Sequence, residues 1–230
     1  MMTVEDDLGI DDECPNEFLS DIGNNCLAIY SPENKSQGTG FIINNDGIFL
    51  SAGHVFKNTS VEHYAYYGNA RYDYKIIDVE YTQNEDYPTE ESCCRDLFVG
   101  KLLDFHGRID TSFHLTESSS LNIGSPLYAM GYSQRICHQR KEQTVDNTTL
   151  YLCRIPVILC SPDRIIRENK GYEIDVRLGM KNVRTIWFDN MDRFHGLSGG
   201  PVFRDKEIYG VFLGDLFVTS EYIMEKLRKI

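Results

Sequence analysis

The feature that most constrains the fold is the position of the histidines relative to one serine motif. Residues 196–200 read Gly-Leu-Ser-Gly-Gly, a Gly-x-Ser-x-Gly pattern that can surround a catalytic serine. In the α/β-hydrolase fold the histidine base follows this serine in the sequence. No histidine follows Ser198 in this chain, because the last one is His195. An α/β-hydrolase is therefore excluded, and any histidine base for Ser198 must come from upstream.

The residues around Ser198 suit a nucleophile. A serine hydroxyl needs a base to take its proton and N–H donors for the oxyanion that forms during acyl transfer. Gly196 allows a turn in which backbone N–H groups converge on one point. Gly199 and Gly200 are expected to leave room for an approaching substrate chain, and Pro201 restricts the exit from the turn.

His54 is the histidine best placed to act as the base. Apolar residues 41–43 and 48–50 flank Asn-Asn-Asp-Gly at 44–47, which predicts a β-hairpin. The small residues 51–53 then place His54 directly after the second strand, where a rigid strand end can fix an imidazole. The five other candidates lack this setting; they are His63, His106, His114, His138 and His195.

Three motifs together resemble one known family. They resemble the trypsin-like serine peptidases of the chymotrypsin fold, and the disulfide-free, HtrA-type branch more than the secreted digestive enzymes. The resemblance implies an all-β fold of two antiparallel six-stranded β-barrels, a chymotrypsin-like double barrel, with a C-terminal helix. It covers roughly residues 24–218 and rests on Gly38-Thr39-Gly40-Phe41, Ser51-Ala52-Gly53-His54-Val55 and Gly196-Leu197-Ser198-Gly199-Gly200-Pro201.

The resemblance also implies an aspartate between the histidine and the serine, at the start of an apolar strand. Asp96 fits, because residues 97–103 are mainly apolar. Three competing acids lie in a polar, tyrosine-rich stretch without such a continuation: Asp73, Asp78 and Asp86. The implied roles are those of a catalytic triad. His54 accepts the Ser198 proton, Asp96 orients the imidazole, and the N–H groups of Gly196 and Ser198 form the oxyanion hole.

Substrate preference is predicted from the residue six positions before the serine. In trypsin-like enzymes that residue lies at the floor of the primary specificity pocket, and here it is Asp192. A carboxylate there would pair with Arg or Lys, because an unpaired buried charge is costly. His195 is expected at the pocket rim, with Gly214 and Asp215 among the substrate-binding residues. Asp189 and Asp215 remain alternative pocket acids, and HtrA-type members usually prefer small apolar residues.

The predicted function is that of a serine endopeptidase that makes limited cuts in intracellular protein substrates, after Arg or Lys. Two alternatives remain: an HtrA-type protease with a small apolar preference, and a non-catalytic pseudo-protease that serves as a binding scaffold. Leu197 stands where activated zymogens carry an aspartate that captures the new N-terminus. We therefore expect constitutive activity or ordering by a regulatory or effector protein partner.

Composition excludes several other classes. The net charge of −12 argues against nucleic acid, and no apolar stretch approaches the 18 residues of a membrane span. The acidic N-terminus lacks the features of a signal peptide. The seven cysteines show no Cys-x-x-Cys, so no zinc site, other metal or cofactor is expected. We expect reduced thiols and a cytoplasmic location.

The chain is predicted to form one peptidase domain over residues 1–230. Residues 1–23 are an acidic lead-in, 24–112 form barrel one, 113–218 form barrel two and 219–230 form the C-terminal helix. Strands are expected at 26–30, 41–50, 63–82, 96–103, 124–132, 149–160, 172–178, 183–188 and 208–213.

Overall fold

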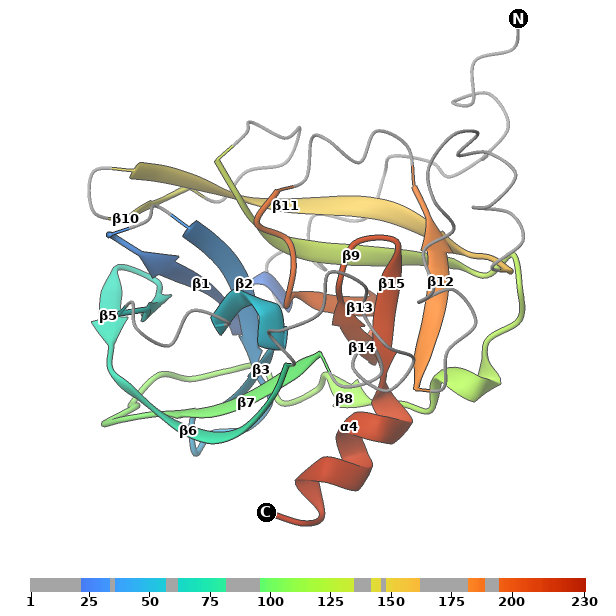
Figure 1. Ribbon diagram of the computed structural model, residues 1–230, viewed down its shortest axis with the longest axis horizontal. Helices are drawn as coiled ribbons and strands as arrows, with labels where there is room; N and C mark the ends of the chain where they lie inside the picture. Colours follow the sequence, from blue (N-terminus) through green and yellow to red (C-terminus); the bar gives the residue numbers. More distant parts are fainter. Residues whose placement is uncertain are drawn as a thin grey trace, which may run out of the picture.

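Two curled, mainly antiparallel sheets and a C-terminal helix make up the fold (Figure 1). The computed structural model describes residues 22–33, 36–56, 62–81, 96–134, 142–145, 148–161, 182–188 and 195–230. The predicted chymotrypsin-like double barrel is confirmed. Most of the predicted lead-in, residues 1–21, and the strand expected at 172–178 lie outside the described residues.

The first sheet closes into a barrel through one bent chain segment. Its order is β5-β4-β1-β2-β3-β7-β6, so β5 and β6 are its two edges. Only Asp73 separates these two edge strands in the sequence, and residues 70–80 therefore join both edges. If β5 and β6 are counted as one bent strand, the seven strands of this described sheet become the six that the resemblance implies. They are β1 (Cys26–Ser31), β2 (Ser36–Ile42), β3 (Ile48–Ser51), β4 (Tyr64–Tyr67), β5 (Ala70–Tyr72), β6 (Tyr74–Glu80) and β7 (Leu97–Leu102).

The second sheet closes through one long strand. Strand β11 pairs with β9 on one side and with β12 on the other, so β9-β11-β12-β15-β14-β13 form a ring of six among the described residues. Strands β8 and β10 extend the sheet to eight, because β8 pairs with β14 and β10 with the first part of β11. The strands are β8 (His114–Leu115), β9 (Pro126–Ser133), β10 (Glu142–Val145), β11 (Thr148–Leu159), β12 (Val183–Trp187), β13 (Pro201–Arg204), β14 (Glu207–Phe212) and β15 (Leu216–Thr219).

The predicted hairpin before His54 is confirmed and has a clear local cause. Strands β2 and β3 pair antiparallel, with Phe41 opposite Leu50. The Asn44 side-chain oxygen accepts hydrogen bonds from the N–H groups of Asp46 and Ile48, at 3.1 and 3.0 Å. Gly47 has a φ of 78°, which glycine adopts without the strain of a side chain. The turn chemistry therefore fixes where β3 begins.

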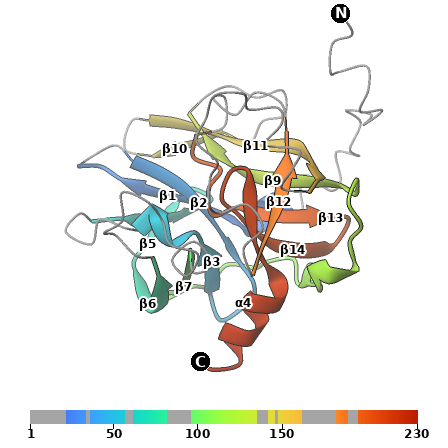
Figure 2. The ribbon, with the colours of Figure 1, turned by 45° about the vertical axis from the view of Figure 1, so that its right-hand side comes forward.

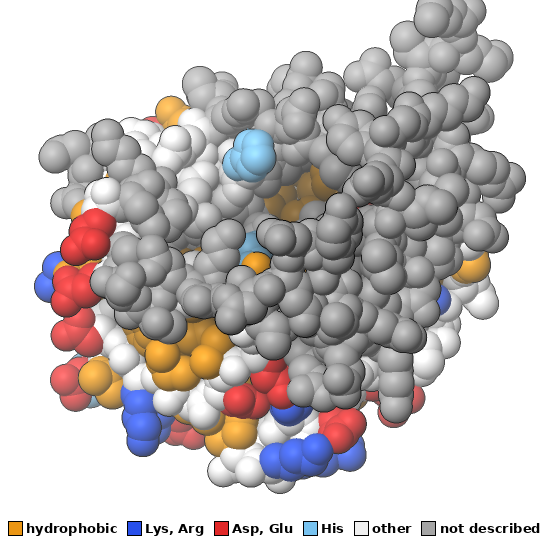
Figure 3. Space-filling model, in the orientation of Figure 1, with side chains coloured by type: hydrophobic (Ala, Val, Ile, Leu, Met, Phe, Trp, Pro, Cys, Tyr) orange, Lys and Arg blue, Asp and Glu red, His pale blue; other side chains and the backbone are white. Residues whose placement is uncertain are grey.

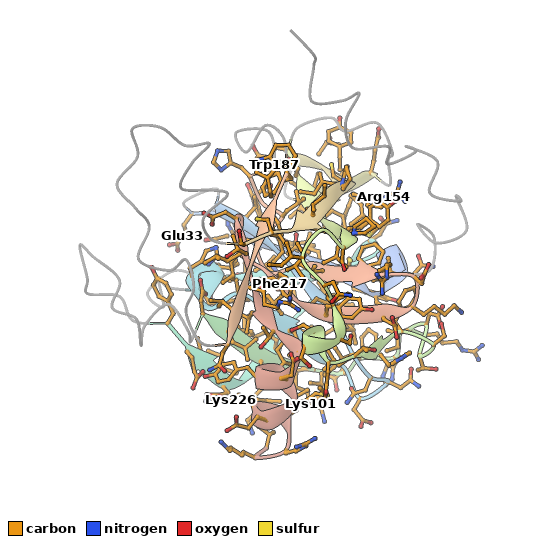
Figure 4. The ribbon with its side chains drawn as sticks, turned by 90° about the vertical axis from the view of Figure 1, so that its right-hand side faces the viewer. Glu33, Lys101, Arg154, Trp187, Phe217 and Lys226 are labelled. Carbon is orange, nitrogen blue, oxygen red and sulfur yellow. The ribbon has the colours of Figure 1, made fainter. Side chains whose placement is uncertain are left out.

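Apolar side chains fill both barrels and the space between them. Aromatic rings dominate the inside of barrel one, where the Phe56 ring stacks on Phe98 with 3.7 Å between centroids. Phe217 is fully buried within barrel two (Figure 4). A third cluster joins the barrels and includes Phe41 from barrel one and Met130 from barrel two. Full burial of such side chains contributes roughly 1.5–3 kcal/mol each, so this contact helps to hold the barrels together.

The C-terminal helix links the end of the chain to barrel one (Figure 2). Helix α4 spans Ser220–Leu227, with Thr219 as N-cap residue. The Tyr222 hydroxyl and the Lys226 ammonium both donate hydrogen bonds to the Glu80 carboxylate at the end of β6. The helix that follows the last strand of barrel two is thereby attached to barrel one.

One cysteine departs from the expectation of reduced thiols. Cys153, in β11, is disulfide-bonded, which departs from the expected reduced thiols. Cys26 and Cys160 are buried thiols. The sequence could not reveal this pairing, because cysteine spacing alone does not give connectivity.

A membrane span has no candidate among the described helices, since each is too short or too polar to cross a bilayer.

Candidate active site

His54 and Asp96 meet at one end of barrel one. His54 follows β3 in a 3-10 turn, η2 (Gly53–Phe56), and Asp96 directly precedes β7, which pairs with β3. The His54 Nδ1 atom lies 2.7 Å from Asp96 Oδ2, and the His54 backbone N–H donates to Asp96 Oδ1 at 2.8 Å. The carboxylate therefore holds both the ring and the backbone of the histidine, which limits rotation of the imidazole.

Close packing around this pair depends on Gly53. A Cβ atom at Gly53 would lie 2.4 Å from the Glu80 carbonyl oxygen, which is a clash, and 3.2 Å from Asp96 Oδ1, which is a tight contact. The Asp96 side chain is only 12% exposed, whereas the His54 side chain is 30% exposed. The acid is thus shielded from water while the imidazole can reach a substrate.

The predicted turn around Ser198 is present and contains two left-handed glycines. Gly196 has a φ of 100° and Gly199 a φ of 91°. The Gly200 N–H donates to the Leu197 carbonyl at 2.9 Å, and the Gly199 N–H donates to the Phe212 carbonyl at 2.8 Å. These bonds fix the backbone on both sides of Ser198 against β14.

Strand β2 of barrel one holds the same turn from the other side. The Thr39 N–H donates to the Ser198 carbonyl at 2.8 Å, and the Thr39 hydroxyl donates to the Gly196 carbonyl at 2.7 Å. The Thr39 hydroxyl also accepts the Tyr132 N–H at 2.8 Å. The Gln37 side-chain amide donates to the His195 carbonyl at 3.2 Å. The serine turn of barrel two is therefore fixed by the strand next to β3.

The prediction that Gly199 and Gly200 leave room for a substrate chain is wrong. A Cβ atom at Gly199 would lie 2.1 Å from the Thr39 carbonyl oxygen and 2.8 Å from the Ala52 nitrogen. At Gly200 it would lie 1.8 Å from the Met130 carbonyl oxygen. The protein's own backbone, rather than a substrate, occupies this space. The contact brings the serine turn against Ala52, two residues before His54.

The expected oxyanion donors have no partner inside the described part of the chain. Neither the Gly196 N–H nor the Ser198 N–H donates a hydrogen bond there. The carbonyl groups of the same turn already accept hydrogen bonds from other N–H and O–H groups of the protein. They are therefore available to an external oxygen atom.

The predicted pocket residues are only partly visible. Asp192 and the alternative Asp189 lie outside the described residues, so the acidic pocket floor stays a prediction. His195 is exposed next to the serine turn. Gly214 and Asp215 lie in the turn between β14 and β15, where the Asp215 carbonyl accepts the Ile186 N–H of β12 at 2.9 Å.

A recess opens on the face of the molecule in Figure 3, with hydrophobic side chains at its floor and histidine side chains beside it. No group of three or more His, Cys, Asp or Glu in the described ranges is arranged to hold a metal ion.

Sequence reasoning missed Gln37, Thr39 and Ser51 as residues that shape the site. The Ser51 hydroxyl donates to the Thr39 carbonyl at 2.6 Å and lies against Gly199. The available signal was a polar residue on each side of Gly38, just before the apolar run that begins at Phe41. That signal shows neither the partner nor the role, because the bonds from Gln37 and Thr39 to the serine turn span more than 150 residues.

The family described as "Trypsin-like peptidase domain" matches residues 38–211. Among curated protein sequences, no significant match was found.

Several solved structures share the fold. The inactive form of the Rv3671c protease, of M. tuberculosis, is 17% identical, with 94% of this chain and 93% of that chain covered and a TM-score of 0.58. Deg5 is 15% identical, with coverages of 97% and 94% and a TM-score of 0.61. Kallikrein-related peptidase 10 is 15% identical, with coverages of 90% and 94% and a TM-score of 0.56.

Proposed function

Because this chain belongs to the family of trypsin-like peptidase domains, we propose that it is a serine endopeptidase. Ser198 Oγ attacks the scissile carbonyl while His54 takes the hydroxyl proton, and His54 then gives that proton to the leaving amine. The acyl-enzyme left on Ser198 is hydrolysed by water, with His54 again acting first as base and then as acid. Asp96 orients the imidazole and stabilises its protonated form.

The observation that carries the proposal is the double attachment of His54 to Asp96. The bond at Nδ1 leaves the other ring nitrogen, Nε2, for exchange of the serine proton. The second bond, from the His54 backbone N–H, holds the backbone of the histidine beside the same carboxylate. A surface histidine without a catalytic role needs neither arrangement.

Backbone N–H groups would stabilise the negative charge that develops on the substrate carbonyl oxygen. The proposed oxyanion hole consists of the N–H groups of Gly196 and Ser198, which have no partner within the described part of the chain. Fixed donors stabilise the transition state because they need no reorganisation when the charge appears.

The proposed substrates are proteins or peptides cleaved after Arg or Lys. This preference rests on Asp192 as the partner of the basic side chain, together with the net charge of −12, which attracts basic segments. A small apolar preference, as in HtrA-type enzymes, is the competing specificity.

The test is hydrolysis of fluorogenic peptides that end in Arg, Lys, Ala or Val. Ser198→Ala should lower kcat by at least about 10⁴-fold, because the nucleophile is lost. The matched control is Ser119→Ala, the same exchange at an exposed serine. Loss of Arg and Lys cleavage in Asp192→Ala would support the basic preference, and release only after Ala or Val would contradict it.

A fluorophosphonate probe separates an enzyme from a scaffold. It should label the wild-type protein at Ser198 and leave Ser198→Ala unlabelled. A folded wild-type protein with neither labelling nor peptide release would be a pseudo-protease, and the proposed activity would be wrong.

A further inference from the structure

The two peptide groups that carry the proposed oxyanion donors are held in different ways. The Leu197–Ser198 peptide is fixed within its own turn, because the Leu197 carbonyl accepts the Gly200 N–H at 2.9 Å. The His195–Gly196 peptide is fixed from barrel one, because the His195 carbonyl accepts the Gln37 amide at 3.2 Å. Among the described residues this is the hydrogen bond that the His195 carbonyl makes.

The bond from Gln37 determines which way the Gly196 N–H points. In a trans peptide the C=O and the N–H lie on opposite sides of the C–N bond. Since the His195 carbonyl points toward Gln37, the Gly196 N–H points away from it. A half-turn of this peptide would exchange the two groups and present an oxygen atom where the oxyanion needs a donor. Gly196 makes such a rotation accessible, because glycine tolerates both signs of φ.

The packing of the Gln37 side chain favours this contact and lowers stability. A Cβ atom at Gly196 would lie 2.4 Å from Gln37 Nε2, so the amide rests directly on the glycine. The other end of the same amide, Gln37 Oε1, is buried without a hydrogen-bond partner. Burying an unpaired carbonyl is unfavourable, and an apolar side chain of equal length would avoid it. The amide N–H is thus the part of the Gln37 side chain that forms a hydrogen bond.

The identity of the donor follows from its partner. The His195 carbonyl can only accept, so the side-chain nitrogen of Gln37 must face it. Strand β2 holds Gln37 opposite Tyr30 in the paired region with β1, which fixes the position of its backbone.

We propose that Gln37 is a positioning residue for the oxyanion hole: its side-chain amide holds the His195 carbonyl and thereby directs the Gly196 N–H toward the reacting carbonyl. The proposal rests on the proposed peptidase function. Gln37 acts on kcat through Gly196 and touches no substrate in this role.

The decisive variant is Gln37→Glu, because a carboxylate only accepts hydrogen bonds and repels the His195 carbonyl. Full loss of one oxyanion donor lowers kcat by about 10²- to 10³-fold, so we expect about a 10- to 100-fold fall in kcat, with KM within about twofold of wild type. Gln37→Met keeps the length without the donor and should lower kcat in the same direction. The matched control is Asn45→Asp, the same amide-to-acid exchange in the exposed turn of the β2–β3 hairpin, which should leave kcat unchanged.

A crystal structure of Gln37→Glu gives a readout that needs no activity. We expect the His195–Gly196 peptide to be rotated, with its carbonyl away from residue 37. An active wild-type enzyme whose Gln37→Glu variant keeps both its kcat and this peptide orientation would overturn the proposal. If the wild-type protein hydrolyses no peptide, the proposed function fails, and an unrotated peptide in the variant would then reject the role of Gln37 as well.

Discussion

The two halves of the candidate site are held in place by different means. On the side of barrel one, a single carboxylate fixes His54 through two hydrogen bonds. On the side of barrel two, several contacts share the work: backbone bonds to β2 and β14, side-chain bonds from Thr39 and Gln37 to carbonyl groups of the Ser198 turn, and contacts that only glycine permits. The first half depends on one chemical group, and the second on small size and on the neighbouring barrel.

This difference predicts how each half fails. Removing a functional group on the histidine side should impair chemistry and leave the fold intact. Adding a single carbon atom on the serine side should impair the fold and, with it, the chemistry.

Asp96→Asn is expected to have the largest effect. The amide is close in size to the carboxylate, but its NH₂ group facing His54 Nδ1 favours the tautomer that cannot accept the Ser198 proton. We expect kcat to fall by about 10⁴-fold in peptide hydrolysis. Asp73→Asn, the same exchange at an exposed acid, is the control. A fall of less than about tenfold would remove Asp96 from the catalytic machinery.

Gly199→Ala should destabilise the protein next most strongly. Its Cβ would lie 2.1 Å from the Thr39 carbonyl oxygen, and its φ is 91°. The control is Gly124→Ala, with a φ of 90° and no atom within 4 Å of the new Cβ, which isolates the backbone strain. That strain is worth about 1–2 kcal/mol, and we expect Gly199→Ala to lose at least about 2 kcal/mol more in urea unfolding. Equal losses would show that the turn can move away from β2.

Glu221→Gln should have the smallest effect, remote from both halves. Burial raises the pKa of this carboxyl, but hydrogen bonds from its own N–H, the Ser119 N–H and the Ser118 hydroxyl outweigh burial and hold the pKa below its usual value. Because the folded-state pKa is lowered, the carboxylate contributes stability above the unfolded pKa of about 4.3, and this is lost as pH falls through the folded pKa.

We expect Glu221→Gln to lower stability at pH 7 by about 1 kcal/mol or less, since the group is partly exposed and solvent screens it. The difference in Tm from wild type should shrink as the pH falls below about 4. Glu225→Gln, at an exposed position on the same helix, is the control. Activity at pH 7 should be unchanged, and a change would link α4 to the site.

Local patterns in the sequence predicted the histidine side well. The turn at 44–47 set the hairpin, and the apolar run after Asp96 predicted the strand that brings the acid beside His54. These features depend on neighbours in the sequence, which is why they could be inferred.

Contacts between distant residues were beyond the reach of the same reasoning. The Thr39 and Gln37 bonds join residues more than 150 positions apart, and no pattern within either segment indicates the other. The space beside Gly199 was assigned to substrate because the sequence does not show which backbone fills it. The pairing of Cys153 was likewise hidden, and it weakens the premise of the predicted cytoplasmic location, which stays a prediction.

The bonds from Thr39 and Phe212 to the serine turn also bear on synthesis of the chain at the ribosome. Thr39 is made before Ser198, whereas Phe212 is made after Ser198 and belongs to β14. Synthesis runs from the N-terminus and a domain generally folds as a unit, so β2 is made long before the turn that it holds can be completed. We therefore expect a nascent chain to remain unable to cut its surroundings until β14 has been translated, even though β2 and Ser198 are made before it.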